Sequence, residues 1–390
     1  MLRITTQGNR EWNAPISCSS PPTRNAATPS GAWPNADPAD PAVAKLLREN
    51  YEAIVDGIKA TGFDYAASVY QGNVPELRVP AVLRVHNMEW VTQGALDFLH
   101  QNKDRPFFLY VAPTLVHAPD AIGSMNQDPR RTPAGLLEKA PDCQPSRKDV
   151  LDRVAPSRAA RKMAGAVWLD DGVGAILKKL DDLNLAQNTL VWLISDNGNR
   201  PKFTCYDGAA RLPSLVRWRG VIPAGRVCRD LACSVDVAPT VLALCGAAED
   251  PDCPTDGQDI TKALKGDGAY SRESVYLEIT TERAVVTKDG YKYIAVRYLP
   301  EAQKQIEAGK KLNHWCRPLD DHTYNADAMP GYFDPDQLYD LKRDPRERRN
   351  LATDPASAER LKKVKEVLEQ YCQKLPNSFG EFKGDTTALP

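Results

Sequence analysis

NTLVWLISDNGNRPKFTCYDGAARLP, residues 188–213, is the stretch of this chain that decides its fold. It opens with TLVWLI, residues 189–194, an uncharged, β-rich run typical of a strand buried on both faces of its sheet. Ser195-Asp196-Asn197-Gly198 follows at once. Side chains at the carboxyl end of a buried parallel strand face the crevice in which open α/β sheets bind ligands. The stretch therefore predicts an α/β fold with a polar loop at one edge of the sheet.

The polar loop combines groups suited to a cation and an anion. Asp196 and Asn197 place a carboxylate and an amide oxygen side by side, and hard cations such as Ca²⁺ and Mg²⁺ select oxygen donors of this kind. Lys202 follows within one short loop and would place an ammonium near an anionic substrate. Gly198 would let the backbone turn away after the strand. A plain turn is the alternative interpretation, because Asn-Gly is a common turn signal.

The same residues resemble a known family. SDNG at 195–198, then Lys202, then DGAARLP at 207–213, is similar to the "SDNG … K … EGG-x-R-x-P" segment of the sulfatases. In that family the Asp and Asn bind a divalent cation, usually calcium, and the Lys contacts the sulfate. The resemblance implies an alkaline-phosphatase-like fold, with a mixed, mainly parallel sheet between helices and a smaller C-terminal α+β domain.

A second family-like segment contains His117. The apolar run FFLYVA, residues 107–112, leads to PTLVHAP, residues 113–119, which resembles the sulfatase segment ending in H-x-P. In the family this His hydrogen-bonds the sulfate, so the resemblance implies that His117 assists at the departing ester oxygen. It also implies that His117 and the loop 196–202 share one rim of the sheet. A structural or merely exposed histidine is the alternative.

Two short strings match the sulfatase nucleophile signature C-x-P-S-R, whose Cys is oxidised to formylglycine. Cys143-Gln144-Pro145-Ser146-Arg147 spells the signature but lies downstream of the H-x-P segment, whereas the family places it upstream. Ser20 opens SPPTR, which lies on the correct side within Pro- and Ser-rich sequence. Cys143 is either a nucleophile or a loop thiol before a helix. A helix N-terminus beside Arg147 would lower the pKa of that thiol.

The family's opening segment has no counterpart in this sequence. The resemblance would require a strand ending in Asp-Asp, which supplies further metal carboxylates, and a Gly-Lys-Trp-His stretch that contacts the sulfate. Asp196 and Asn197 supply two side chains, whereas a hard cation takes about six or more oxygen ligands. We therefore expect an N-terminally truncated sulfatase relative that binds calcium weakly and has impaired or no activity.

Three functions are compatible with these features. The first is hydrolysis of an aryl or carbohydrate sulfate, the second is a non-catalytic relative that binds anionic or glycan ligands, and the third is a phosphoester or phosphonate hydrolase with a Ser or Thr nucleophile. Formylglycine at Cys143 would favour the first, anion binding without turnover the second, and preference for phosphate esters the third. The expected partner is a sulfated small molecule or glycan; the sequence leaves its identity and the oligomeric state open.

The bulk composition argues against other partners. Fifty Lys and Arg residues balance 51 Asp and Glu residues, giving a net charge of -1, so there is no electrostatic case for nucleic acid or an anionic membrane. No apolar run is long enough to span a bilayer. The N-terminus, MLRITTQGNREWNAP, lacks the apolar core of a signal peptide, although sulfatases are often exported.

The 390 residues suffice for more than one domain. We expect an irregular segment at 1–41, an α/β domain at 42–262 and an α+β domain at 263–390. The apolar spacing predicts helices at 42–62, 91–100, 159–185 and 357–375, and strands at 63–70, 107–112, 189–194, 275–279, 284–287 and 291–296. Asp40 and Pro41 would start the first helix, and Asp289-Gly290 would form a hairpin turn. Asp236 would cap the helix that Pro239 begins.

Overall fold

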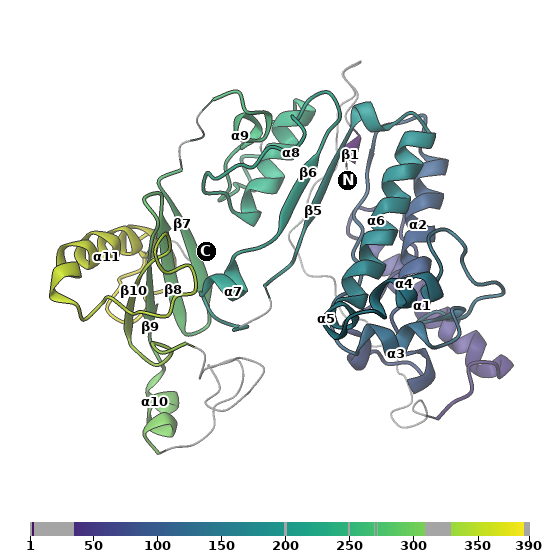
Figure 1. Ribbon diagram of the computed structural model, residues 1–390, viewed down its shortest axis with the longest axis horizontal. Coiled ribbons are helices and arrows are strands. Elements are labelled where there is room, and N and C mark those ends of the chain that lie inside the picture. Colours follow the sequence, from purple (N-terminus) through teal and green to yellow (C-terminus); the bar gives the residue numbers. More distant parts are fainter. Residues whose placement is uncertain are drawn as a thin grey trace. The chain divides into compact units, whose positions relative to one another are not determined.

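The computed structural model describes residues 2–3, 35–198, 201–248, 250–268, 270, 272–308 and 329–385, whose helices and strands are labelled in Figure 1. The chain divides into a first unit, Met1–Val191 with Trp218–Gly220, and a second unit, Trp192–Arg217 with Val221–Pro390. The division passes through the strand that opens the fold-deciding stretch. The boundaries expected from the sequence, near residues 41 and 262, stay predictions.

Helices are the main regular elements in the described part of the first unit. They are α1 (Pro41–Lys59), η1 (Val74–Glu76), η2 (Ala81–Leu83), α2 (Met88–Gln101), α3 (Ala121–Met125), α4 (Arg147–Val154), α5 (Arg158–Lys162), α6 (Ala164–Asp182) and η3 (Ala186–Asn188). α2 and α6 pack against each other, and Phe98, Leu99 and Leu180 belong to the core cluster that they share. Full burial of such a side chain contributes about 1.5–3 kcal/mol. The helices predicted near 42, 91 and 159 are confirmed.

The start of α1 follows the expected signals. The Asp40 carboxylate accepts hydrogen bonds from the backbone N–H groups of Ala42 at 2.8 Å and Val43 at 3.2 Å. Pro41 occupies the first turn, where its missing N–H costs nothing because that position has no intrahelical acceptor.

The strand predicted at 63–70 is wrong. The segment is rich in residue types that strands favour, but its aromatic side chains pack sideways against α2. The Tyr65 ring lies 5.3 Å from that of Phe98, and the Tyr70 ring lies 5.6 Å from that of Trp90. Tertiary packing onto a helix has therefore overridden local strand propensity.

A four-stranded sheet contains the run TLVWLI, in the order β2-β1-β5-β6. Its strands are β1 (Leu2–Arg3), β2 (Phe107–Phe108), β5 (Thr189–Ile194) and β6 (Ser214–Arg217), and a separate pair is formed by β3 (Arg131–Thr132) and β4 (Gly135–Leu136). β1 lies antiparallel to both β2 and β5. β5 has the predicted bounds, whereas β2 is shorter than the predicted 107–112.

The predicted mainly parallel sheet between helices is not confirmed. β1 is antiparallel to both β2 and β5, β3 is antiparallel to β4, and the three strand pairs of the C-terminal sheet are antiparallel too. The predicted burial of the run 189–194 on both faces is also wrong, because Thr189 and Leu190 are buried whereas Leu193 and Ile194 are exposed. The mixed α/β character of the chain is nevertheless present in the described helices and strands.

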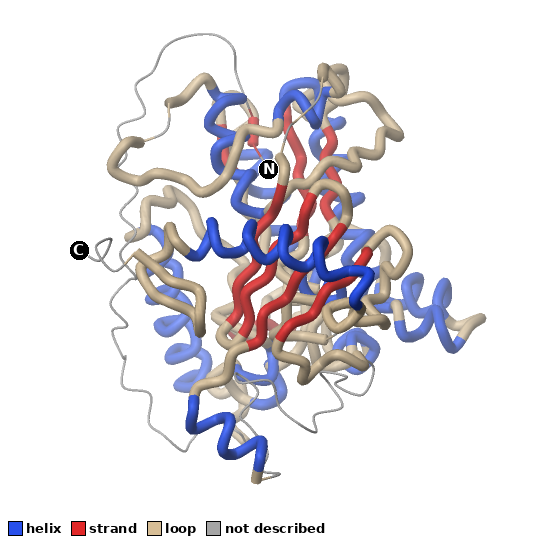
Figure 2. The backbone as a smooth tube through the Cα atoms, turned by 90° about the vertical axis from the view of Figure 1, so that its left-hand side faces the viewer, coloured by secondary structure: helices blue, strands red, loops and turns tan. Residues whose placement is uncertain are grey.

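A second sheet forms the C-terminal part of the second unit, in the antiparallel order β10-β9-β8-β7. Its strands are β7 (Ser274–Ile279), β8 (Glu282–Thr287), β9 (Tyr291–Val296) and β10 (Asp336–Asp340). Helix α11 (Ala358–Cys372) lies across one face (Figure 2) and buries Leu368 against Val285 and Leu338. The predicted hairpin is confirmed, with Gly290 at a φ of +95°. This unit thus contains the expected antiparallel strands and terminal helix.

Shorter elements complete the second unit. They are α7 (Asp207–Ala210), η4 (Ser234–Asp236), α8 (Val237–Cys245), α9 (Thr261–Lys265), α10 (Pro300–Glu307) and η7 (Pro355–Ser357). The buried Asp236 side chain does not cap α8, contrary to expectation. Its carboxylate accepts the backbone N–H groups of Cys233 at 2.7 Å and Gln258 at 2.9 Å, and it pairs with the Arg272 guanidinium. Its role is structural, as expected, but it joins separate segments.

No helix in the described part of the chain is both long and apolar enough to cross a membrane.

Candidate functional site

The loop after β5 presents two oxygen-bearing side chains to solvent. Asp196 and Asn197 are both exposed. The Asn197 amide donates a hydrogen bond to the Asp196 carboxylate at 2.7 Å, so the two groups lie side by side. The Ser195 hydroxyl donates to the Asn197 carbonyl at 2.7 Å and tightens the turn. This contact uses the amide nitrogen of Asn197, and the predicted pairing of the carboxylate with the amide oxygen stays a prediction.

The backbone of this loop is held by the segment around α7. The Ser195 N–H donates to the Pro213 carbonyl at 3.2 Å, and the Gly198 N–H donates to the Ala209 carbonyl at 2.8 Å. A Cβ on Gly198 would lie 2.3 Å from the Gly208 carbonyl oxygen. The glycine is thus needed for close approach of two backbones, and φ is not positive there. This corrects the expectation that Gly198 serves the turn itself.

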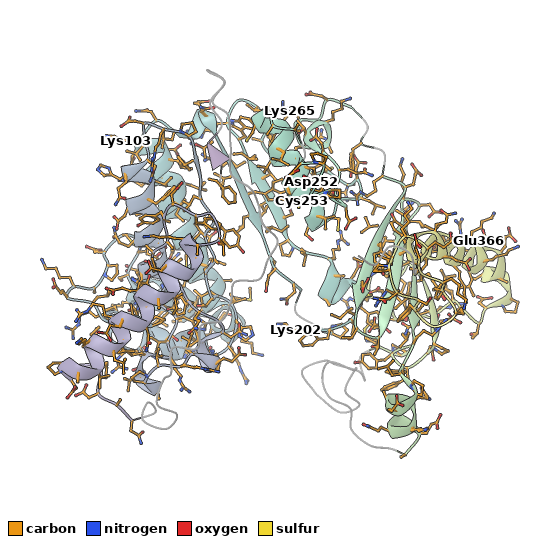
Figure 3. The ribbon with its side chains drawn as sticks, turned by 180° about the vertical axis from the view of Figure 1, so that it is seen from behind. Lys103, Lys202, Asp252, Cys253, Lys265 and Glu366 are labelled. Atoms are coloured by element: carbon orange, nitrogen blue, oxygen red, sulfur yellow. The ribbon has the colours of Figure 1, made fainter. Side chains whose placement is uncertain are left out.

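Lys202 lies in the short segment before α7 and is half-buried (Figure 3). It belongs to the same unit as Asp196 and Asn197, so the described structure keeps these three residues on one stretch of chain. His117 belongs to the other unit. The predicted common rim for His117 and the Asp196 loop stays a prediction.

His117 is exposed in the loop after β2, where its Nδ1 lies 3.2 Å from the Ala118 carbonyl oxygen. A second histidine, His86, contacts that loop through both of its ring nitrogens. Its Nδ1 lies 2.7 Å from the Thr114 hydroxyl and its Nε2 lies 3.1 Å from the Pro119 carbonyl oxygen. Sequence reasoning missed His86, because nothing local links it to a loop about thirty positions away.

The contacts of His86 define its protonation. A carbonyl oxygen can only accept, so Nε2 carries the proton toward Pro119, and Nδ1 accepts from the Thr114 hydroxyl. Burial lowers the pKa of His86, while the Pro119 carbonyl acts in the opposite direction. The neutral ring therefore spans both ends of the loop that carries His117.

The described residues do not form a complete calcium site. Calcium takes about six to eight oxygen ligands, of which Asp196 and Asn197 would supply two side chains. Among the residues that the structure describes, no group of three or more His, Cys, Asp or Glu side chains is arranged to hold a metal ion. Asp196 and Asn197 therefore fit part of such a site, and their role as calcium ligands stays a prediction.

Cys143 does not behave as the activated thiol that the sequence suggested. Its sulfur donates to the Glu89 carbonyl oxygen at 3.3 Å. Burial, together with the Glu89 charge, raises the pKa of Cys143 to about 12. The expectation of a lowered pKa is wrong because the Arg147 guanidinium binds the Glu89 carboxylate, at 3.0 Å, instead of stabilising a thiolate. The thiol is therefore protonated at neutral pH.

The other residues of the string CQPSR also have structural partners. Gln144 accepts a hydrogen bond from the Thr92 hydroxyl at 2.7 Å. Ser146 caps α4 in a reciprocal capping box with Asp149. Arg147 donates to backbone carbonyls besides its ion pair with Glu89. The string therefore joins α2 to α4 in this fold. The other nucleophile candidate, Ser20, lies outside the described residues.

Comparison with known proteins places these observations in a family. The family model described as Sulfatase matches residues 29–247, more than half of the chain. Steryl-sulfatase of Rattus norvegicus is 28% identical over 302 residues, covering 69% of this chain and 45% of the relative. N-acetylgalactosamine-6-sulfatase of Canis lupus familiaris is 33% identical over 211 residues, covering 50% and 35%. Arylsulfatase A of Homo sapiens is 29% identical over 279 residues, covering 66% and 46%. The chain thus spans less than half the length of these curated relatives.

Solved structures of sulfatases have a similar fold. The PsFucS1 sulfatase from Pseudoalteromonas sp. has a TM-score of 0.50 at 19% identity, covering 86% of this chain and 63% of that chain. Ps i-CgsB, solved in complex with k-i-k-neocarrahexaose, has a TM-score of 0.51 at 17% identity, covering 84% and 63%. At these identities the likeness concerns the fold, which confirms the predicted alkaline-phosphatase-like class at the level of a mixed α/β architecture.

Proposed function

The chain belongs to the sulfatase family, and from this premise we propose that it acts on sulfate esters of aryl or carbohydrate compounds. The observation that carries the proposal is the loop after β5. It exposes Asp196 and Asn197 side by side, keeps Lys202 close in sequence, and is held by backbone hydrogen bonds that leave both side chains accessible.

The proposed chemistry is cleavage of the bond between sulfur and the ester oxygen, with water supplying the oxygen of the released sulfate. Negative charge develops on the departing ester oxygen and on the sulfate oxygens. The Lys202 ammonium would offset the charge on the sulfate, and His117 would donate a proton to the departing oxygen. Preorganised groups of this kind are worth roughly 10²–10³ each in rate.

Turnover requires a nucleophile and a bound cation, and these two requirements limit the activity that we propose. The sulfatase nucleophile is a formylglycine made by oxidation of the Cys, and we propose that Cys143 is not its source, because CQPSR lies downstream of His117 and its thiol donates to the Glu89 carbonyl. Asp196 and Asn197 alone do not complete a calcium site, and we assign no step to a cation. We therefore propose that turnover by this chain is weak or absent.

The protonated thiol of Cys143 and the incomplete calcium site also favour a second candidate, a non-catalytic relative that binds anionic or glycan ligands. An ammonium and an imidazole suffice to bind a sulfate group, whereas catalysis also needs a nucleophile. In this case Lys202 and His117 would retain their contacts with the anion, and no ester would be cleaved.

Turnover of 4-nitrocatechol sulfate tests the proposal, with calcium present and a formylglycine-generating enzyme coexpressed. If the chain is catalytic, Asp196→Ala and Lys202→Met should each lower kcat/KM by roughly 10² or more, and Cys143→Ala should leave it unchanged. Calorimetric binding of sulfate without turnover, lost in Lys202→Met, would establish the non-catalytic candidate. Faster cleavage of 4-nitrophenyl phosphate would indicate a phosphoester hydrolase, and neither turnover nor binding would overturn the proposal.

A further inference from the structure

A buried lysine on the C-terminal sheet holds the segment that follows Lys202. Lys292, on β9, is fully buried. Its ammonium donates to the Cys205 carbonyl at 3.0 Å and to the Glu347 carboxylate at 2.8 Å, and it pairs with the Asp207 carboxylate. An ammonium has three donor hydrogens, so these three contacts satisfy it fully.

Glu347 completes the same arrangement from the loop after β10. One carboxylate oxygen accepts from Lys292, and the other accepts the Asp207 backbone N–H at 2.7 Å. Glu347 is buried and has a φ of +55°, a left-handed conformation that is strained for a non-glycine residue. The carboxylate that joins Lys292 to α7 compensates for this strain.

Two further side chains from the sheet hold the same segment. The Glu282 carboxylate, on β8, accepts the Cys205 backbone N–H at 2.8 Å. The Tyr206 hydroxyl donates to the Gln337 side chain, on β10, at 2.6 Å. Three adjacent strands therefore anchor the residues immediately before α7.

The anchored segment in turn holds the Asp196 loop. Gly198 donates its N–H to the Ala209 carbonyl and packs so closely against Gly208 that a Cβ would not fit. A continuous set of contacts therefore runs from the sheet, through α7, to the backbone next to Asp196 and Asn197. All of these residues belong to the second unit.

The charges in this arrangement support a stable ammonium. Burial alone would lower the pKa of Lys292, but the carboxylates of Glu347 and Asp207 outweigh that effect and raise it. Removing one partner of a buried ion pair is strongly destabilising, whereas replacing the whole pair by apolar residues of similar volume is often neutral. This difference allows stability and positioning to be separated by experiment.

We propose that Lys292 is a positioning residue, which acts with Asp207 and Glu347 to fix the loop that carries Asp196, Asn197 and Lys202 on the C-terminal sheet. The proposal rests on the proposed function for the importance of that loop to a sulfate ligand. The fixed position of the loop is a separate, physical claim that can be measured whether or not the chain turns over substrate.

Three variants of the full chain test the proposal. Lys292→Met breaks the buried pair, and the double variant Lys292→Met/Glu347→Met replaces it with apolar side chains. Lys288→Met is the matched control, because Lys288 follows β8 and makes an exposed pair with Glu273 at 3.1 Å. Urea unfolding gives the stability of each variant, and hydrogen exchange followed by mass spectrometry reports the loop through peptides covering 195–213, with α11 as the reference.

A purely structural lysine and a positioning lysine give different results in the double variant. If Lys292 positions the loop, the double variant regains part of the stability lost in Lys292→Met, because Glu347 no longer leaves a buried unpaired carboxylate, yet the loop exchanges roughly tenfold or more faster than in the wild type, while α11 does not. Exchange of the loop within about twofold of the wild type and of Lys288→Met would overturn the proposal. If Lys292→Met does not fold, loop exchange in the double variant alone tests the proposal.

Kinetics separate this proposal from the proposed function. Where the wild type turns over 4-nitrocatechol sulfate, the double variant should lose roughly 10² in kcat with a smaller change in KM, because small displacements of reacting groups are costly. Unchanged kcat in a variant with a loosened loop would overturn the link between position and catalysis. If the wild type has neither turnover nor sulfate binding, the proposed function fails, and the exchange result still decides whether Lys292 fixes the loop.

Discussion

Two short segments of this chain match sulfatase signatures letter by letter, and they use their side chains in opposite ways. In the loop after β5, the backbone of Ser195 and Gly198 makes the holding hydrogen bonds, and Asp196 and Asn197 are exposed. In the string CQPSR at 143–147, the polar side chains themselves bond to neighbouring elements. Side chains that stay exposed, as in the loop after β5, are available to bind a ligand. Side chains that bond to neighbouring elements, as in CQPSR, stabilise the fold instead.

The largest expected effect is on the structural segment. Arg147→Met would leave the buried Glu89 carboxylate without its ion-pair partner and should destabilise the protein by about 3–5 kcal/mol. Urea unfolding measures the change. The matched control is Arg130→Met, because Arg130 pairs with Asp128 in a more exposed setting, and its loss should cost far less stability than the loss of Arg147. An equal loss of unfolding free energy in the two variants would contradict a structural role for Arg147.

The reactivity of Cys143 provides the next test. Because its pKa is raised to about 12, the thiolate fraction falls tenfold for each pH unit below that value, and alkylation by iodoacetamide at pH 8 should be roughly 10³-fold slower than for an ordinary thiol. Peptide mass spectrometry over a range of pH gives the rate, with the exposed Cys228 as the internal comparison. Similar rates at the two cysteines would show that burial and the Glu89 charge do not keep the Cys143 thiol protonated.

A smaller effect is expected for Gly198→Ala. The added Cβ would overlap the Gly208 carbonyl oxygen, and overpacking of this kind costs about 1–3 kcal/mol. Gly174→Ala is the control, since Gly174 lies within α6 with open space around it and should be stabilised by up to about 1 kcal/mol. Thermal unfolding should therefore shift in opposite directions for the two variants, and a shift in the same direction would mean that the loop tolerates separation from α7.

The smallest effect on stability is expected at the site itself. Asp196→Ala removes an exposed side chain and should change the unfolding free energy by less than about 0.5 kcal/mol. Calcium or sulfate binding, measured by calorimetry, should weaken in the same variant. Asp182→Ala, in an exposed pair with Lys178, serves as the control and should leave binding unchanged. A large loss of stability in Asp196→Ala would show that the carboxylate is a structural group.

Local signals in the sequence predicted several elements correctly. Asp40 and Pro41 start α1, Asp289-Gly290 closes the hairpin between β8 and β9, and the uncharged run at 189–194 forms β5. Each of these depends on residues within a few positions of one another. The strand expected at 63–70 rests on the same kind of evidence and is wrong, because Tyr65 and Tyr70 pack on Phe98 and Trp90 of α2, which lie 33 and 20 positions further along the chain.

The sequence by itself determined the family, the chemical groups of the loop after β5, and the local elements, because each follows from residue types at short spacing. Tertiary structure alone decided that His86 supports the His117 loop and that the thiol of Cys143 stays protonated. It also placed Lys292 against Asp207, which lies 85 positions earlier in the chain. Burial and long-range contacts set these properties, and neither is visible in the spacing of residues along the chain.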